Sequence, residues 1–362
     1  MRFHHAKMSI TLLLFTFLVT LAPHQVQAAD ESLRQHYDEM DIPIQSEDYV
    51  IHDPSRVITK GEKQMIAVTG KAQEDGYSCG LETWYRTNYS ASWKPGQCLF
   101  KNKPHWIEDL FDYQDGAYWA PELVKPRVMF YSVADFSDRS SITCVGLARA
   151  KGPFPNKLTW TDSGRPTSCV DKEDFEEEVS AIDPTTLTDE NGTVYLITGG
   201  GIIHGTELNK RYEPVSGEWF SPGFKSWTQL ARGPKSDDGY GWVEAAYAHY
   251  RGGWYYLFVN WGGCCQGIDS TYNIRVGRSR NPLGPYEDKN GKDMLYGGGS
   301  LFLRSRKFMI GPGHTSIHKD PHGDVFCFHY YDKRREGAAW IAERRLRWAK
   351  SGWPVVGKVL SS

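Results

Sequence analysis

The stretch His52-Asp53-Pro54-Ser55 is the first of five short motifs that recur along this chain, each with an acid or a histidine. The other four are Trp119-Ala120-Pro121-Glu122, Ala181-Ile182-Asp183-Pro184, Val243-Glu244-Ala245-Ala246 and Gly311-Pro312-Gly313-His314. Their polar residues are separated by 69, 61, 61 and 70 positions. A period of about sixty residues is too long for a solenoid repeat but suits a four-stranded propeller blade with long loops. The spacing therefore predicts an all-β, five-bladed β-propeller whose polar residues converge at one end of the central channel.

An aromatic or β-branched run follows each motif, which strengthens this prediction. Turn residues such as Arg251-Gly252-Gly253 separate several of the motifs from their runs. The runs are Met65–Val68, Val128–Tyr131, Val194–Ile197, Trp254–Val259 and Val325–Phe328. Such a run on its own is an ordinary core strand. Its fixed place after each motif indicates an inner strand, a tight turn and a second strand, repeated five times.

The first 28 residues have the layout of a secretory signal peptide. A short basic start is followed by the uncharged apolar run Ile10–Leu21 and by small residues up to Ala28. The run is shorter than the roughly 20 residues that a spanning helix needs, so cleavage near Ala28 is preferred to an uncleaved anchor. We expect a secreted protein in which residues 29–362 form one propeller domain.

Composition limits the classes of partner. The formal charge is −2 at pH 7, which gives no electrostatic footprint for nucleic acid or a membrane. Aromatic residues make up 14% of the chain, and because aromatic faces stack on sugar rings, this excess favours a carbohydrate ligand. We expect a monomer.

Seven cysteines in an exported chain allow disulfides. Cys79 with Cys98 and Cys144 with Cys169 are plausible local pairs. Cys264 and Cys265 either bond to each other or pair elsewhere, and Cys327 lies in an apolar run that suits a buried thiol. The absence of any Cys-x-x-Cys spacing argues against zinc.

Carboxylates are the groups with the clearest chemical use. Hydrolysis of a glycosidic bond needs an acid to protonate the leaving oxygen and a carboxylate to activate water or attack the sugar. Asp53 and Glu244 are the natural pair. Glu244 precedes an apolar strand, where partial burial would raise its pKa and keep it protonated. Asp183 is a third carboxylate that could position the acid.

The ordered motifs, from His52-Asp53-Pro54 to Val243-Glu244-Ala245, resemble glycoside hydrolase family 43. The later segments Gly262–Gly267, Asp269–Ile274 and Gly311–His314 are similar to its arabinanase branch, the endo- and exo-acting α-1,5-L-arabinanases. The resemblance covers about residues 49–331. Two departures concern the setting of the acid: Ala246 replaces a usual proline, and Ser180 replaces a common asparagine.

The resemblance implies a five-bladed propeller and an inverting enzyme acting on the plant cell-wall polysaccharide arabinan. By motif, Asp53 would be the general base, Glu244 the general acid and Asp183 the residue that orients Glu244 and modulates its pKa. His314 would help to hold a hydrated Ca²⁺ in the central channel, or it would be a buried hydrogen-bonded histidine. No organic cofactor is expected.

Other motif residues have supporting roles in this interpretation. His52 would shape the floor of the substrate site, and Trp119 would line the sugar pocket or pack within its blade. Glu122 would make supporting hydrogen bonds. Rival functions are a related activity on the same fold (α-L-arabinofuranosidase, β-xylosidase or a galactan-cleaving enzyme) and a carbohydrate-binding propeller without turnover.

Overall fold

The computed structural model describes residues 51–69, 81–100, 103–111, 117–134, 141–217, 219–220 and 224–359. The leader, its cleavage site and Cys79 lie outside these ranges. The described residues belong to one compact unit. In the described part of the chain, no helix has the length and hydropathy needed to span a bilayer.

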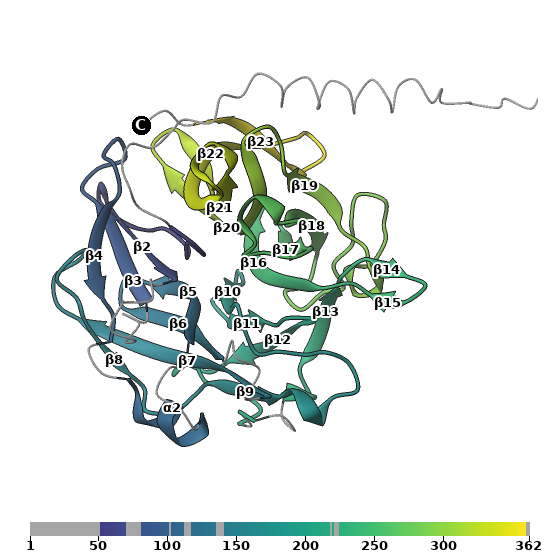
Figure 1. Ribbon diagram of the computed structural model, residues 1–362, viewed down its shortest axis with the longest axis horizontal. Helices are drawn as coiled ribbons and strands as arrows, with labels where there is room; N and C mark the ends of the chain where they lie inside the picture. Colours follow the sequence, from purple (N-terminus) through teal and green to yellow (C-terminus); the bar gives the residue numbers. More distant parts are fainter. Residues whose placement is uncertain are drawn as a thin grey trace, which may run out of the picture. The chain divides into compact units, whose positions relative to one another are not determined.

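Five antiparallel sheets, each built from strands in sequence order, confirm the predicted propeller (Figure 1). Blade 1 contains β1 (Ile58–Lys60), β2 (Lys63–Thr69), β3 (Leu81–Arg86) and β4 (Lys94–Cys98). Blade 2 contains β5 (Ala117–Lys125), β6 (Val128–Ala134), β7 (Ile142–Lys151) and β8 (Thr159–Asp162), with β9 (Ser168–Asp171) paired to β7. Blade 3 contains β10 (Thr185–Thr188), β11 (Val194–Thr198), β12 (Ile202–Leu208) and β13 (Thr228–Arg232).

The last two blades follow the same plan. Blade 4 contains β16 (Val243–Arg251), β17 (Trp254–Trp261), β18 (Asn273–Ser279) and β19 (Ser300–Arg304). Blade 5 contains β20 (Met309–Asp320), β21 (Gly323–Asp332), β22 (Ala338–Trp348) and β23 (Pro354–Val359). The short elements are α2 (His105–Leu110), the hairpin β14 (Lys235–Ser236) and β15 (Gly239–Tyr240), and the 3₁₀ turns η1 (Lys172–Asp174), η2 (Gly267–Asp269), η3 (Met294–Tyr296) and η4 (Lys333–Arg335).

The apolar runs found in the sequence lie in the second strands, β2, β6, β11, β17 and β21, as predicted. Their side chains are mostly buried and pack between neighbouring blades rather than within one. At the boundary of blades 4 and 5, for example, the ring centroid of Phe302 lies 4.9 Å from that of Phe326 in blade 5 and 5.3 Å from that of Phe258 in its own blade. The apolar faces of each blade are therefore covered by its neighbours.

One residue near the start of each inner strand has a left-handed backbone, and these five residues define the true register of the repeat. They are Asp53, Ala120, Asp183, Ala245 and His314, with φ between 39° and 52°. The sequence register was correct for blades 1, 3 and 5 but wrong for the other two. Glu122 lies two residues after the equivalent position and Glu244 one residue before it, because a bulge interrupts the pairing of β5 and of β16 at this point.

A hydrogen bond between neighbouring blades fixes these left-handed residues. For four of the five, a polar residue directly after the apolar run of a neighbouring blade's second strand accepts the backbone N–H group. Ala120 N donates to Thr69 Oγ1 (3.0 Å), Asp183 N to Ser132 Oγ (2.9 Å), His314 N to Asn260 Oδ1 (3.2 Å) and Asp53 N to His329 Nδ1 (3.2 Å). We call Thr69, Ser132, Asn260 and His329 the inter-blade caps. They satisfy buried donors that the bulged strand cannot pair.

Arg56 connects the blades at the centre of the ring. Its guanidinium forms an ion pair with Glu122 of blade 2 (2.7 Å), donates to Thr186 O of blade 3 (2.6 Å) and lies over the ring of Tyr247 in blade 4. Tyr247 in turn donates to Ile317 O of blade 5 (3.0 Å). Glu122 thus has the supporting role expected of it, whereas no sequence motif indicated Arg56.

The cysteines agree with the sequence where they are described. Cys144 and Cys169 form a disulfide between β7 and β9, Cys264 and Cys265 form a vicinal disulfide, and Cys327 is a buried thiol. Because Cys79 lies outside the described residues, its pairing with Cys98 stays a prediction.

Blades 1 and 5 meet through a buried ion pair that closes the ring. Arg86 on β3 donates from both terminal nitrogens to the Glu343 carboxylate on β22, at 2.7 and 2.9 Å. Glu343→Gln should lower the free energy of unfolding by about 3–5 kcal/mol, because the buried guanidinium loses its counter-charge. The exposed pair Arg165–Glu213 gives the control, and Glu213→Gln should cost below about 1 kcal/mol. Equal urea midpoints for the two variants would contradict this assignment.

Candidate active site

Four of the five motifs place a titratable side chain at the same end of the ring. Asp53, Asp183 and His314 occupy the left-handed positions of blades 1, 3 and 5, and Glu244 immediately precedes that of blade 4. Asp183 Oδ2 accepts the N–H of the residue after Glu244 (2.9 Å), and His314 Nδ1 lies 3.3 Å from Asp53 Oδ1. The charges of Glu244 and Asp53 raise the pKa of Asp183, and the charge of Asp53 raises that of Glu244. These residues therefore converge in space, as the motif spacing predicts.

Four side chains surround the Asp53 carboxylate. Thr69 Oγ1 donates to its Oδ2 (2.6 Å), and His52 Nδ1 lies 2.8 Å from the same oxygen. The other oxygen, Oδ1, lies 3.3 Å from His314 Nδ1 and 3.5 Å from His329 Nδ1. Oδ2 is thus committed to fixing the carboxylate, and Oδ1 has only longer contacts.

The charge state of Asp53 follows from this setting. Burial works to raise its pKa, but the imidazoles of His52, His314 and His329 and the His52 hydrogen bond outweigh burial and hold the pKa well below the ordinary range. Asp53 is accordingly ionised near neutral pH, which is the state that can accept a proton.

Glu244 has the opposite tendency. Trp242 Nε1 donates to Oε2 (2.7 Å), and the Tyr272 hydroxyl donates to Oε1. These two bonds lower the pKa, but burial is the larger effect and the nearby Asp53 charge adds to it, so the pKa of Glu244 is raised. A carboxyl group with a raised pKa can hold a proton near neutrality and release it to a leaving group.

Asp183 acts on Glu244 through the backbone. Its Oδ2 accepts the N–H of Ala245 (2.9 Å), the residue that carries the left-handed turn directly after Glu244. In this one blade the carboxylate replaces the inter-blade cap, because the equivalent Thr198 donates instead to Ile182 O (2.5 Å). Burial, followed by the charges of Glu244 and Asp53, raises the pKa of Asp183 well above its ordinary value.

Trp242 is positioned by glycines of blade 3. A Cβ at Gly200 would lie 2.8 Å from the Trp242 ring, and one at Gly201, where φ is 76°, would lie 1.9 Å from Glu178 O. Only glycine fits at these two positions. Because Gly200 has no side chain, the Trp242 indole can approach Glu244. The departure Ser180 lies beside this turn and exchanges backbone hydrogen bonds with Gly200, while Ala246 is part of the buried core.

His52 and Trp119 lie at the edges of the carboxylate group. The His52 ring stacks on His329 with centroids 4.1 Å apart, and its Nε2 is 2.7 Å from the Tyr331 hydroxyl. Burial works to lower the pKa of His52, but the Asp53 charge and hydrogen bond outweigh it and raise the pKa. Trp119 is half-buried and precedes Ala120, whose N–H is bound by Thr69. Its place at the end of blade 2 suits contact with a ligand.

The histidines around Asp53 can contribute to a metal site. His52, Asp53 and His329 offer ligand atoms within 4.8 Å of one another, and His314 Nδ1 lies 3.3 Å from Asp53. Burial lowers the pKa of His314 and keeps its imidazole neutral, as a metal ligand must be. With one carboxylate in the group, a hard cation here would take most of its ligands from water, which fits the expected hydrated ion.

Sequence reasoning missed several residues of the site. The inter-blade caps were detectable, because a polar residue directly follows each apolar run at Thr69, Ser132, Thr198, Asn260 and His329. Trp242 was detectable as the aromatic neighbour of the Val243–Ala246 motif. Tyr331 carries no such signal, since it is one of several tyrosines in a strand.

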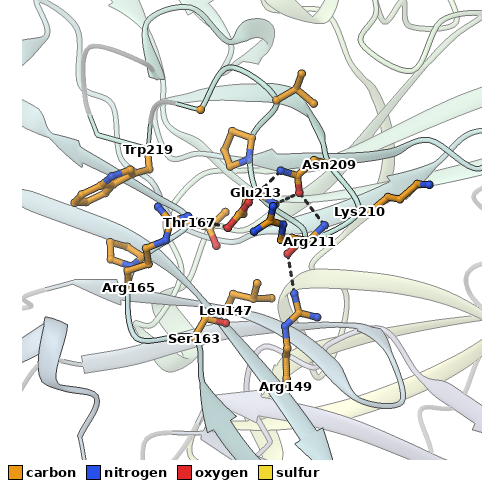
Figure 2. A pocket seen from close by; sticks show the side chains of 14 residues that line it. Leu147, Arg149, Ser163, Arg165, Thr167, Asn209, Lys210, Arg211, Glu213 and Trp219 are labelled. Carbon is orange, nitrogen blue, oxygen red and sulfur yellow. Dashed lines mark hydrogen bonds and ion pairs between the residues drawn. The ribbon is translucent and has the colours of Figure 1, made fainter.

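The pocket drawn in Figure 2 lies apart from these carboxylates. It has a volume of about 590 Å³ and is lined by residues of blades 2 and 3, among them Arg149, Arg165 and Arg211. Its charged groups bind one another: Arg165 donates to Glu213 (2.8 Å), and Arg149 donates to Arg211 O (2.7 Å). It contains none of the predicted site residues.

Comparison with known proteins connects this geometry to one family. The model of the glycosyl hydrolases family 43 matches residues 50–354. The extracellular exo-α-(1→5)-L-arabinofuranosidase ArbA of Cellvibrio japonicus is 31% identical over 84% of this chain and 86% of its own. The extracellular endo-α-(1→5)-L-arabinanase 1 of Bacillus subtilis is 30% identical over 84% and 87%. The structure of Cellvibrio cellulosa α-L-arabinanase complexed with arabinohexaose has a TM-score of 0.72 at 27% identity, covering 86% of this chain and 96% of the other.

Tyr272→Phe should raise the pKa of Glu244 further, because the substitution removes a donor that stabilises the carboxylate while burial is unchanged. The measurement is a ¹³C NMR titration of protein labelled at the Glu side-chain carboxyl carbon. Tyr256→Phe is the matched control, since its hydroxyl bonds to Gly352 O (2.5 Å) and does not contact the site. An unchanged or lowered Glu244 pKa in Tyr272→Phe would contradict the assignment.

Proposed function

This chain belongs to glycosyl hydrolase family 43, and from that premise we propose that it cleaves the α-1,5-L-arabinofuranosyl linkages of arabinan with inversion of configuration. The observation that supports this most directly is the opposite shift of two carboxyl groups in one site. The pKa of Asp53 is lowered and that of Glu244 is raised, which is the division of charge that a general base and a general acid require.

In the proposed reaction, Asp53 Oδ1 accepts a proton from a water molecule as the water attacks the anomeric carbon. Glu244 gives its proton to the oxygen of the departing sugar, so that the glycosidic bond breaks and the acid becomes a carboxylate. The water must fit between base and sugar, so we expect the two carboxyl groups to stand roughly 6.5–9.5 Å apart. Asp183 fixes the Ala245 N–H and thereby the backbone that carries Glu244.

The substrate is assigned from the relatives. Their names specify α-1,5-linked arabinan, and the endo- and exo-acting relatives are similar to this chain to the same degree. His52 and Trp119 are the proposed sugar contacts at the two sides of the carboxylates. Both relatives are named as extracellular, in agreement with a secreted protein whose leader is cleaved near Ala28.

Linear α-1,5-arabinan should be hydrolysed by the purified protein, and Glu244→Gln should slow this reaction about 10²- to 10⁴-fold because the leaving oxygen is no longer protonated. The assay resolves products by size: a ladder of oligomers indicates endo action, and a single short product indicates exo action. An arabinofuranoside with a dinitrophenolate leaving group separates the roles. This leaving group departs without protonation, so the hydrolysis rate of Glu244→Gln should approach that of the wild type on this substrate. The rate of Asp53→Asn should stay low, because the water still needs a base.

Full activity of Glu244→Gln on arabinan would refute the assignment. Hydrolysis of β-xyloside or galactan alone would replace arabinan by a related substrate. Tight arabinan binding without product at any pH would indicate a binding propeller.

We also propose that His314 helps to hold a hydrated Ca²⁺ in the central channel, where the ion would supply fixed positive charge near the carboxylates. Ca²⁺ at a hundred times its Kd should then raise the free energy of unfolding by about 2.7 kcal/mol relative to protein in EDTA. His314→Ala should abolish the increase. The measurement is urea unfolding at fixed ionic strength, with Na⁺ as the control, and an equal increase in His314→Ala would contradict the proposal.

A further inference from the structure

The vicinal disulfide lies in a loop beside the proposed base. The loop Gly262–Gly267 connects β17 to η2 and is anchored at both ends, because Gly263 N donates to Thr271 Oγ1 (2.9 Å) and Gln266 N donates to Ser270 Oγ (3.0 Å). Cys265 is exposed to solvent, and its Sγ lies 4.0 Å from His52 Nε2. The disulfide is therefore both accessible to a reagent and close to the reacting groups.

A continuous series of hydrogen bonds connects this loop to Asp53. The N–H of Cys265 donates to the Tyr331 hydroxyl oxygen (2.7 Å), and the same hydroxyl lies 2.7 Å from His52 Nε2. His52 Nδ1 then lies 2.8 Å from Asp53 Oδ2. The Cys265 N–H fixes the position of the Tyr331 phenol oxygen, and this oxygen holds the His52 ring through Nε2. The ring is thereby oriented with Nδ1 facing the Asp53 carboxylate.

The backbone of Cys265 explains why the disulfide matters for this series. Its φ is 66°, in the left-handed region that a residue with a Cβ enters only at a cost of about 1–2 kcal/mol. A bond between adjacent side chains closes a small ring containing the Cys264–Cys265 peptide, which restricts rotation on both sides of it. Once the disulfide is reduced, the ring is open and no longer holds Cys265 at positive φ. Relaxation would turn its N–H away from Tyr331.

We propose that the Cys264–Cys265 disulfide is a redox-sensitive positioning element for Asp53, with Tyr331 and His52 as the positioning residues between them. The proposal depends on the proposed function of Asp53 as base. Oxidised, the loop fixes Tyr331, and Tyr331 fixes the His52 ring against the carboxylate. Reduced, the loop releases Tyr331, and Asp53 keeps only Thr69 as a short side-chain partner.

The reduction is a two-electron exchange with a dithiol. A thiolate of the dithiol attacks the exposed Sγ of Cys265, and the bond to Cys264 breaks. The Cys264 thiolate takes up a proton. The second thiol of the reagent, as thiolate, then displaces Cys265, which is protonated in turn, and the reagent leaves as its own disulfide.

The test compares arabinan oligosaccharide kinetics of oxidised protein with protein reduced by dithiothreitol. We expect kcat to fall about ten- to hundred-fold, as for a displaced catalytic group, with a smaller change in KM because the proposed sugar contact at Trp119 persists. Reoxidation should restore kcat. Mass spectrometry after alkylation confirms which cysteines were reduced, and Cys144–Cys169, with both residues fully buried, should stay intact.

Variants separate positioning from folding. Cys264→Ser with Cys265→Ser, and separately Tyr331→Phe, should show the kcat of the reduced protein and no response to dithiothreitol. Tyr330→Phe is the matched control, because this neighbouring tyrosine is buried near Asp332 and has no contact with the site; it should keep full kcat and full sensitivity to reduction. Full kcat in reduced wild type or in Tyr331→Phe would overturn the proposal.

A spectroscopic readout keeps this proposal separate from the proposed function. The ¹⁵N shifts of His52 report which ring nitrogen carries the hydrogen, whether or not arabinan is hydrolysed. Reduction should change them in wild type and leave them unchanged in Tyr331→Phe. Inactive oxidised protein would refute the function alone, whereas unchanged His52 shifts on reduction would refute the positioning role alone.

Discussion

The hydrogen bond from one blade's second strand to the left-handed residue of the next is the constraint on which the site depends. A residue with positive φ leaves its N–H outside the regular ladder, and a buried N–H must find an acceptor. Thr69, Ser132, Asn260 and His329 provide that acceptor across the blade boundary. The position of each of these motif residues therefore depends on two blades. A change in the packing between blades would displace the side chains of the site.

Asp183 shows how the ring accommodates function. Four left-handed N–H groups are bound by inter-blade caps, but the fifth, that of Ala245, is bound by a carboxylate. Thr198, at the position equivalent to the inter-blade caps, bonds elsewhere, and a titratable acid next to Glu244 takes its role. This arrangement places a third carboxyl group in a buried space, where the charges of Glu244 and Asp53 raise its pKa.

Two carboxyl groups of the same chemical type acquire different charge states because their partners differ. Asp53 is surrounded by imidazoles, which favour its ionised form. Glu244 has only neutral donors, Trp242 and Tyr272, and these do not offset its burial. His52, Asp53 and His329 also offer ligand atoms for a cation in the same space. Acid, base and ion would then be adjacent parts of one electrostatic arrangement rather than separate sites.

The sequence by itself determined the number of blades, the second strands and the convergence of Asp53, Asp183, Glu244 and His314, because a repeat period and alternating apolar runs are local properties of the chain. Only the tertiary structure decided the register within the motifs, where bulges displace Glu122 and Glu244. It also decided which side chains bind each carboxylate. His329 and Tyr331 reach Asp53 and His52 from the far end of the chain, and Arg56 gains partners from several blades. Such contacts depend on how blades face one another, and no local pattern encodes that.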